Sequence, residues 1–510
     1  MAIGLLLPIC LVWLWFPSDA DEALFQIGAR RLNEGAAYYR DFWDIKQPGI
    51  YWFYQVGDLF GLGGLGVRLL ELGFALVGGL LVWRTVRHWG LHPLARVLAP
   101  VMVLGSYLLL SHRSGVGQIE GLTNVLVVTM VAACWPIGGG SAGLPRPGWR
   151  WFLAGMAGGV LGVLKLLYLP LAVILLLGAL ADTRVGLLGR LRLALFAAAG
   201  ALVPLGATAV YLAQHEALRL AWLTAVQIPV ETLGTAVMDD DRTRHVELLI
   251  GLSGLVPLAL IGLAGAGRRG TRVRESTLTL LLVVSAALSL PQYPTPYRFL
   301  VTIAPLGMLA VLGVSSVLAV VERRAPGPAR RRLRAAVLAL LALLALPMAR
   351  GPQRLIFAAG SVSSWSLAEQ PRLQRDLLLA GAPLQQDVEP VRSLVTPGEP
   401  IFVLGDPRIY LLLRARQATE VSGWAATLLP QRVWAERDRE LVRSRPELIY
   451  VEDVTMPQVR LRSPGLAAML DRSYRVLGQA GAGTWYRTDT PGVPAAIPGD
   501  NRMARADPPA

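Results

Sequence analysis

Hydrophobic residues in this chain are gathered into long runs that are separated by short polar segments. A helix needs about 20 apolar residues to cross a bilayer, and shorter runs can cross where the bilayer or the helix adapts. The two short runs within 151–181 also fit a re-entrant pair. The pattern predicts a polytopic α-helical membrane domain over 1–347 with about eleven transmembrane helices, placed at 3–16, 65–83, 94–110, 121–136, 151–164, 168–181, 193–213, 247–266, 276–290, 299–320 and 335–347.

Arginine residues distinguish two alternating sets of loops between these runs. One set is rich in arginine, for example at 268–274 and 323–334, whereas the opposite set is poor in basic residues for its length. By the positive-inside rule the arginine-rich loops face the cytoplasm. The first long loop (17–64), Lys165 and the C-terminal region are therefore expected together on the extracytoplasmic side.

The pattern changes after the last apolar run. Short buried strands are predicted at 400–405 and 448–452, and a helix at 430–444. These elements predict a small extracytoplasmic α/β domain over 348–490. The end of the chain, 491–510, is rich in Pro, Ala, Gly and Asp and is predicted to be disordered.

Composition agrees with a membrane protein, since 54% of the 510 residues are hydrophobic, 16% are charged and the mean hydropathy is +0.48. The net charge of +14 comes from arginines in short loops, where they set topology, so we expect no nucleic-acid partner. Cys10 and Cys134 lie inside apolar runs and suggest neither a disulfide framework nor a thiolate metal site. Lys46 and Lys165 are the only lysines in the sequence.

The long polar stretch after the first apolar run carries the clearest candidate chemistry. Residues 19–49 read DADEALFQIGARRLNEGAAYYRDFWDIKQPG and include the adjacent carboxylates Asp21 and Glu22, followed by YRD at 39–41 and DIKQP at 44–48. Carboxylates can act as a general base or as hard oxygen ligands for a divalent cation. Taken without its neighbours, the pair also fits solvated charges or a helix N-cap.

This combination of motifs resembles the first outer loop of GT-C glycosyltransferases, membrane enzymes that use polyprenyl-phosphate sugars. The resembling branch includes protein O-mannosyltransferases and the aminoarabinose transferases of lipid A. The family pattern Asp-x-Lys-Pro-Pro is matched at Asp44 and Lys46, but Gln47 stands where the first proline is usual. Lys46 fits the family's contact with the lipid-linked phosphate, although an interfacial lysine that snorkels is the plainer alternative.

The resemblance implies roles for the carboxylates. Asp21 would be the catalytic base that deprotonates the acceptor, and Glu22 would tune the site or help Asp21 to hold a divalent cation. Asp41 lies in the Tyr-Arg-Asp motif and supports the site, while Asp44 would orient Lys46 or the acceptor.

Two later segments supply further candidates for the donor phosphate. Lys165 lies in GVLGVLKLLYLP at the end of an apolar run, where an ionisable group is expensive to bury unless it snorkels to the surface. It resembles the family's Leu-x-Lys, which helps to bind that phosphate. Tyr297 and Arg298, in PQYPTPYRFL, resemble the aromatic and basic residues before a late helix that meet the same group, the alternative being an aromatic belt with a flanking arginine.

Weaker expectations concern the rest of the outer face. The loop at 214–246 is a candidate cover over the site, and Arg113 and Glu120 are candidates to line a cavity. The C-terminal domain resembles in outline the extracytoplasmic domains of some GT-C relatives.

The sequence therefore predicts an inverting GT-C transferase in the plasma (inner) membrane. It would move a sugar from a polyprenyl-phosphate donor to a lipid, glycan or protein acceptor on the outer face, with a divalent cation as a candidate cofactor. A transporter or lipid flippase is the alternative from another class, although it would place paired ionisable residues near the bilayer midplane. A non-catalytic scaffold with the GT-C fold is the third reading.

Overall fold

Two compact units make up the protein. The first unit comprises Met1–Phe16, Arg68–Ala207 and Val237–Trp365, and the second comprises Pro17–Val67, Thr208–Ala236 and Ser366–Ala510. The computed structural model describes residues 2–14, 18–110, 117–135, 148–183, 185–232, 254–265, 272–290, 296–324 and 384–489, together with positions 252, 332, 335, 336 and 339.

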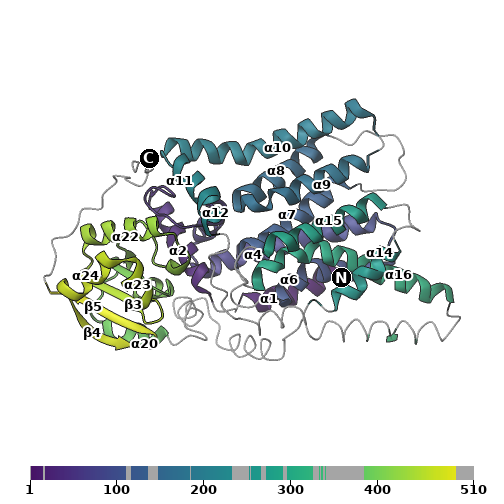
Figure 1. Ribbon diagram of the computed structural model, residues 1–510. Helices are drawn as coiled ribbons and strands as arrows, with labels where there is room; N and C mark the ends of the chain where they lie inside the picture. Colours follow the sequence, from purple (N-terminus) through teal and green to yellow (C-terminus); the bar gives the residue numbers. More distant parts are fainter. Residues whose placement is uncertain are drawn as a thin grey trace. The chain divides into compact units, whose positions relative to one another are not determined.

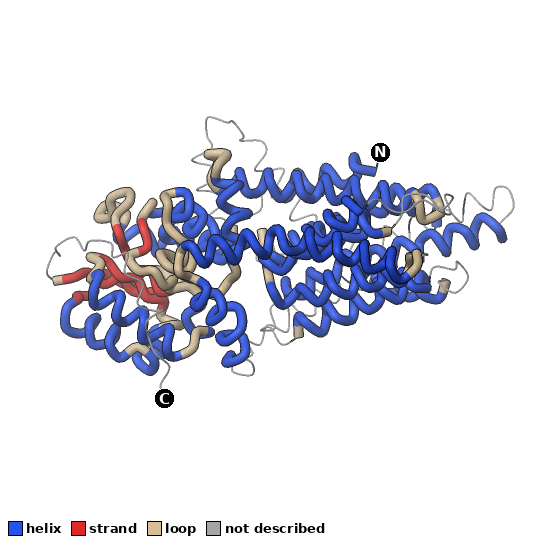
Figure 2. Tube along the Cα trace, turned by 90° about the horizontal axis from the view of Figure 1, so that it is seen from above, coloured by secondary structure: helices blue, strands red, loops and turns tan. Residues whose placement is uncertain are grey.

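The first unit is built from helices that run side by side (Figures 1 and 2). A π-helical turn, Val101–Gly105, joins α5 to α6. Helices α4 and α10 are assigned to this unit because most of their residues belong to it. The helices are α1 (Ala2–Trp13), α4 (Gly64–Arg87), α5 (Pro93–Pro100), α6 (Ser106–Leu110), α7 (Ile119–Cys134), α8 (Gly148–Leu164), α9 (Leu169–Ala181), α10 (Leu187–Gln214), α14 (Leu255–Ala264), α15 (Arg272–Ser289) and α16 (Ile303–Arg324).

The lengths and surfaces of these helices identify an integral membrane protein. Four stretches in the described part of the chain are long and apolar enough to span a bilayer: Gly64–Arg87, Pro93–Leu110, Leu187–Gln214 and Tyr297–Arg323. Helix α10 leaves many leucine side chains uncovered, which suits a surface that faces lipid. The total of eleven spans stays a prediction, since most of 335–347 and part of 247–266 lie outside the described residues.

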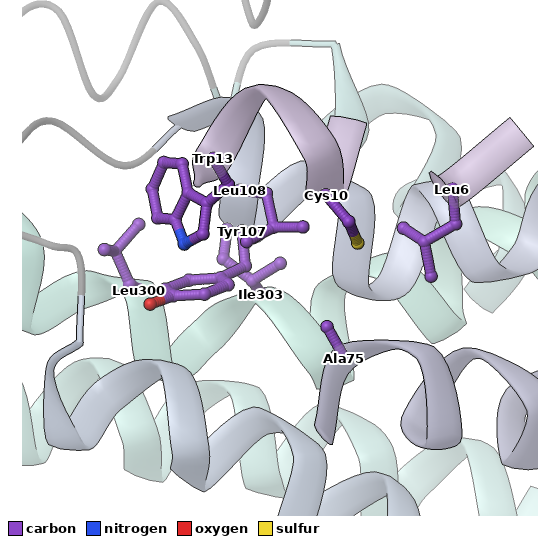
Figure 3. Close-up of a cluster of buried hydrophobic side chains, with 8 residues drawn as sticks. All are labelled: Leu6, Cys10, Trp13, Ala75, Tyr107, Leu108, Leu300 and Ile303. Carbon is purple, nitrogen blue, oxygen red and sulfur yellow. The ribbon is translucent and has the colours of Figure 1, made fainter. Parts of the chain in front are cut away.

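Close packing within the first unit depends on small side chains and on one apolar cluster. A Cβ added to Gly313 on α16 would overlap the carbonyl oxygen of Leu258 on α14, so the two backbones can touch only because glycine lies there. The apolar cluster includes the buried Cys10 of α1 (Figure 3). In the same cluster the rings of Trp13 and Tyr107 meet edge to face, with centroids 6.0 Å apart.

The second unit contains a helical hairpin from the first long loop. Helices α2 (Ala20–Asn33) and α3 (Pro48–Asp58) pack through Phe25, whose ring lies edge-on to Tyr51 and Tyr54 at centroid distances of 5.4 and 5.2 Å. The same unit includes α11 (Leu218–Trp222) and α12 (Ile228–Thr232).

A five-stranded sheet, of which Figure 1 labels β3, β4 and β5, forms the core of the C-terminal part of the second unit. Its strand order is β2-β1-β3-β5-β4. The first three strands in this order are parallel, and the last two are antiparallel to their neighbours. The register pairs Val403 of β1 with Tyr450 of β3. Strand bounds are β1 Pro400–Leu404, β2 Arg416–Gln417, β3 Leu448–Glu452, β4 Tyr474–Ala480 and β5 Gly483–Thr488.

Helices flank this sheet, and both central strands are buried, as expected for parallel strands that are covered on two faces. The strands predicted at 400–405 and 448–452 and the helix predicted at 430–444 are confirmed. The predicted domain start at 348 and the tail at 491–510 lie outside the described residues. The helices are α20 (Leu384–Val388), α21 (Arg408–Leu413), α22 (Gln431–Ser444), α23 (Met456–Arg462) and α24 (Pro464–Ser473).

Candidate functional site

Helix α2 begins with a capping arrangement that fixes Glu22. Asp19 is the N-cap with an extended backbone, and its amide donates to Oε2 of Glu22 over 3.2 Å. The hydroxyl of Tyr54 donates to the other oxygen of Glu22 over 3.4 Å. Burial, followed by the charge of Asp21, raises the pKa of Asp19 above its ordinary value. The buried Glu22 side chain therefore has a structural role at the start of the helix that carries Asp21.

Asp21 lies in the first turn of α2 between two donors. Its Oδ2 is 3.1 Å from Nζ of Lys46, and its Oδ1 accepts a hydrogen bond from the indole Nε1 of Trp424 over 2.7 Å. The Lys46 ammonium also lies over the ring of Phe25, 5.6 Å from its centroid. The side chains of Asp21 and Lys46 retain 13% and 18% of their exposure, so both can still meet a ligand.

The backbone at Lys46 is held by a buried group of tyrosines. The hydroxyls of Tyr38 and Tyr39 donate to the carbonyl of Lys46 over 2.8 and 2.9 Å. Asp44 accepts from Tyr51 over 2.8 Å and from the amide of Lys46 over 3.4 Å. Burial raises the pKa of Asp44, although the positive charge of Lys46 opposes the shift. Asp44 therefore contacts the segment that carries Lys46, and its role in orienting Lys46 or the acceptor stays a prediction.

Asp41 stabilises the turn before this segment. Its Oδ2 accepts from the amide of Ala37 over 2.7 Å, and Arg40 donates to both carboxylate oxygens over 2.9 Å. Partial burial opposes ionisation, but these hydrogen bonds and the charge of Arg40 hold the pKa of Asp41 below its ordinary value. Asp41 thus stabilises the conformation of this loop.

The α/β domain contributes backbone and side-chain contacts to this loop. The amide of Trp43 donates to the carbonyl of Glu420 over 2.9 Å, and the amide of Ser422 donates to the carbonyl of Trp43 over 3.4 Å. Two residues after Ser422, the chain reaches Trp424 and hence Asp21. Trp424 could not be predicted from the sequence, because no motif surrounds it and its partner Asp21 lies 403 positions away.

A second contact from the α/β domain holds the residues before α2. Arg408 follows the carboxyl end of the parallel strand β1, the end at which loops of parallel sheets commonly form sites. Its Nη1 donates to the carbonyl of Ser18 over 3.3 Å. The guanidinium is itself paired with Asp406, with Nε 3.0 Å from Oδ1. Arg408 was also missed from the sequence.

In the first unit, Lys165 lies at a break between two helices. Helix α8 ends at Leu164, Lys165 is extended (φ −162°, ψ 105°), and a 3₁₀ turn follows at Leu166–Tyr168. Its Nζ lies 3.0 Å from Oε1 of Glu120, and the Tyr168 hydroxyl donates to the same oxygen over 2.9 Å. Glu120 is only 2% exposed, whereas Lys165 keeps 18%.

Arg298 belongs to the same group of charges. It lies in the 3₁₀ helix Pro296–Thr302, with its guanidinium 5.7 Å from the ring centroid of Tyr297. The positive charges of Arg298 and Lys165 both act on the Glu120 carboxylate. The predicted candidates Lys165, Arg298, Tyr297 and Glu120 are therefore neighbours within the first unit.

Asn124 positions the segment that carries Arg298, and sequence reasoning missed it. Its Nδ2 donates to the carbonyl of Leu300 and its Oδ1 accepts from the amide of Ala304, each over 2.8 Å. A buried asparagine on an apolar helix is costly unless both ends of its amide are paired, which this geometry achieves.

The carboxylates predicted to hold a divalent cation, Asp21 and Glu22, both accept hydrogen bonds from protein groups, and the cation site stays a prediction. The oxygens of Asp21 accept from an ammonium and an indole, while those of Glu22 accept from an amide and a hydroxyl. In the described part of the chain, no group of three or more His, Cys, Asp or Glu residues could hold a metal ion. Arg113 and the second part of the loop predicted as a cover, from 233 to 246, lie outside the described residues.

Comparison with known proteins shows a likeness in fold without a match in sequence. No protein-family model matches the chain, and no curated protein matches it either. The structure is similar to that of ArnT from Cupriavidus metallidurans bound to undecaprenyl phosphate, with a TM-score of 0.59, 16% identity, and 95% of this chain and 97% of that chain covered. Against the same protein in the apo state, the TM-score is 0.56 at 17% identity, with 95% and 96% covered.

A looser similarity links the chain to the archaeal oligosaccharyltransferase AglB from Archaeoglobus fulgidus in complex with an inhibitory peptide and a dolichol-phosphate. The TM-score is 0.49 at 12% identity, with 97% of this chain and 75% of that chain covered. ArnT is a lipid A aminoarabinose transferase with the GT-C fold. The likeness to ArnT confirms, at the level of the fold, the GT-C resemblance predicted from the sequence.

Proposed function

We propose that this protein is a GT-C glycosyltransferase that moves a sugar from a polyprenyl-phosphate donor to an acceptor on the extracytoplasmic face of the plasma (inner) membrane, with Asp21 as general base. The observation that carries the proposal is the placement of Asp21. A partly exposed carboxylate lies between a lysine and an indole N–H, on a fold like that of ArnT, whose structure holds undecaprenyl phosphate.

The ion pair of Asp21 and Lys46 suggests how the base becomes available. A carboxylate paired with an ammonium is a weak base, because proton transfer to it would break that pair. A donor phosphate offers Lys46 a competing anion, and when Nζ moves to the phosphate it releases Oδ2 of Asp21. Donor binding therefore precedes activation of the acceptor.

In the transfer step the acceptor oxygen attacks the anomeric carbon of the sugar, and its proton passes to Oδ2 of Asp21. The bond between that carbon and the phosphate oxygen breaks, so that polyprenyl phosphate departs with the bonding electrons and the configuration inverts. Lys46 stabilises the negative charge that develops on the departing phosphate. An aqueous acceptor and a lipid-held leaving group suit an enzyme in a membrane.

Lys165 and Arg298 are proposed as donor-phosphate groups of the first unit. Arg298 offers a planar fork that suits phosphate oxygens, and Lys165 offers a compact point charge. The buried Glu120 keeps these cations charged and in place while no phosphate is bound. A divalent cation remains a candidate for the donor complex, and no step depends on it.

A second candidate, a lipid transporter or flippase, is favoured by one feature. The break between α8 and α9 places an ion pair at an interrupted helix, which is the arrangement that many transporters use for their substrate sites. Movement of a fluorescent polyprenyl phosphate between leaflets of proteoliposomes, without sugar transfer, would favour this function over the enzyme.

The proposed enzymatic activity is tested by measuring sugar transfer in membranes that contain equal amounts of each variant. Wild type, Asp21→Asn and Asp58→Asn are supplied with undecaprenyl phosphates that carry radiolabelled hexoses or pentoses. Asp58 is a matched control because it is a partly exposed carboxylate of the same hairpin. Its Oδ2 accepts a hydrogen bond from Nδ2 of Asn33 over 2.9 Å. We expect transfer by wild type and Asp58→Asn but not by Asp21→Asn. Equal transfer by all three would remove Asp21 from the mechanism, and no transfer by any would reject the enzyme.

A further inference from the structure

The segment of the α/β domain that ends at Trp424 is fixed from the side of the sheet. Gly423 lies against β1 so closely that a Cβ there would overlap the carbonyl oxygen of Val403. The amide of Trp424 donates to Oγ of Ser422 over 3.0 Å, and the next residue, Ala425, has a left-handed backbone with φ 51°. Such a conformation persists only where the surroundings hold it, so the indole is displayed from a rigid turn.

The same segment is also fixed from the side of the first long loop. The two backbone hydrogen bonds of Trp43, to Glu420 and from Ser422, join residues 420–422 to the loop that carries Lys46 three residues later. The indole of Trp43 donates to Oγ1 of Thr224 over 3.1 Å, which anchors this junction to a third part of the second unit. One hydrogen-bonded junction therefore carries both partners of Asp21.

We propose that Trp424 is a positioning residue for the catalytic base: its indole N–H holds Oδ1 of Asp21, so that Oδ2 is presented to Lys46 before donor binding and to the acceptor afterwards. The α/β domain thus completes the active site. This inference rests on the proposed function and assigns to the C-terminal domain a role that no sequence motif indicates.

Loss of the Trp424 indole N–H has two expected consequences. A hydrogen bond to one oxygen leaves the carboxylate a single orientation, and a base that is misplaced by about 1 Å can lose about a hundredfold in rate. The same bond favours the ionised form, so its removal raises the pKa of the carboxylate. Loss of the indole N–H should therefore lower the rate and move the acid limb of the pH–rate profile to higher pH.

The experiment compares Trp424→Phe with a matched variant, Trp485→Phe, in the full-length protein. Trp485 lies in the same domain, is buried, and donates its Nε1 to the carbonyl of Asp387 over 2.6 Å, so its replacement also removes one indole hydrogen bond. For Trp424→Phe we expect transfer about ten- to a hundredfold slower and an acid limb about one pH unit higher. Trp485→Phe should leave the acid limb unmoved, whatever its stability.

Trp424→His is a second variant, because its ring N–H can replace the lost donor and restore part of the rate. A double-mutant cycle of Asp21→Ala and Trp424→Phe, monitored by unfolding temperature, tests the contact without any assay of activity. We expect the two changes to be non-additive, since each removes the same interaction.

The outcomes separate this inference from the proposed function. If wild type transfers sugar, Asp21→Asn does not, and Trp424→Phe matches wild type in rate and acid limb, then the role of Trp424 is wrong and the enzyme stands. Additive effects on unfolding temperature would likewise overturn the contact. If wild type transfers no sugar from any donor, the proposed function fails and this role fails with it.

Discussion

The two lysines of the chain lie in different units, and each is paired with one carboxylate. Lys46 meets Asp21 at 3.1 Å and Lys165 meets Glu120 at 3.0 Å, and the two lysine side chains are equally exposed. The carboxylates differ, because Glu120 is almost completely enclosed whereas Asp21 keeps part of its surface. An enclosed carboxylate can only hold a neighbouring charge, while an accessible one can exchange partners and take up a proton.

The second donor to each carboxylate shows the same contrast. Glu120 accepts from Tyr168, which lies three residues after Lys165, so a single helix break supplies both donors. Asp21 accepts from Trp424, which lies in the same unit but 403 positions further along the chain. A site assembled from distant segments can respond to ligand binding, whereas a local one is set when the helices pack. We therefore propose proton transfer as the role of the Asp21 pair. For Glu120 we propose that it keeps the neighbouring cations charged and in place.

The largest predicted effect comes from breaking the enclosed pair. Glu120→Gln leaves Lys165 without its counter-ion in an apolar setting and should destabilise the protein by about 3–5 kcal/mol. Asp21→Asn should cost only about 1–2 kcal/mol, because an asparagine oxygen can still accept from Trp424. Unfolding temperatures of detergent-solubilised variants measure both.

The double variant Glu120→Gln with Lys165→Met provides the control for that prediction. It removes both charges together and should recover much of the lost stability. If Glu120→Gln were no less stable than Asp21→Asn, the two pairs would not differ in the way that their burial indicates.

A smaller effect should follow from replacing the lysine of the accessible pair. Lys46→Met should weaken the binding of fluorescent undecaprenyl phosphate about ten- to a hundredfold, because a charge-assisted contact to phosphate is lost. Arg30→Met is the matched control, since it removes a cation of the same hairpin that lies 3.9 Å from Asp58. Equal binding by the two variants would exclude Lys46 from the donor site.

Much of the fold and part of this contrast could be predicted from the sequence. Hydrophobic runs predict helices and strands because burial of one face makes apolar residues recur at a regular spacing. The Asp-x-Lys motif identified Asp44 and Lys46 from neighbouring residues alone. Trp424, Arg408 and Asn124 could not be found in this way, because each acts through a contact with a polar or backbone group far along the chain. No periodic pattern records such contacts.

The smallest predicted effect is confined to the second unit and depends on pH. Burial, reinforced by Glu440 and Asp41, raises the pKa of Glu420 to about 8, and burial raises that of Glu440 to about 7. Both exceed the ordinary value of about 4.3, so the folded protein binds more protons than the unfolded chain. The stability that these groups contribute is present below about pH 4 and is lost as the pH rises towards 8.

Glu420→Gln keeps this position neutral at every pH. It should raise the unfolding temperature by about 2–4 °C at pH 8 and by less at pH 5. Glu389→Gln, which alters an exposed glutamate 3.3 Å from Arg392, serves as the control and should show no such difference. An equal shift at both pH values would show that Glu420 is already ionised in the folded protein.

The most direct test of the assignment is the rate of sugar transfer by Asp21→Asn at saturating donor, measured beside the amount of donor bound. We predict transfer about a thousandfold slower than that of wild type, with donor binding equal or tighter because Lys46 has lost its anionic partner. Transfer within about tenfold of wild type at equal donor binding would contradict the role of Asp21 as the base.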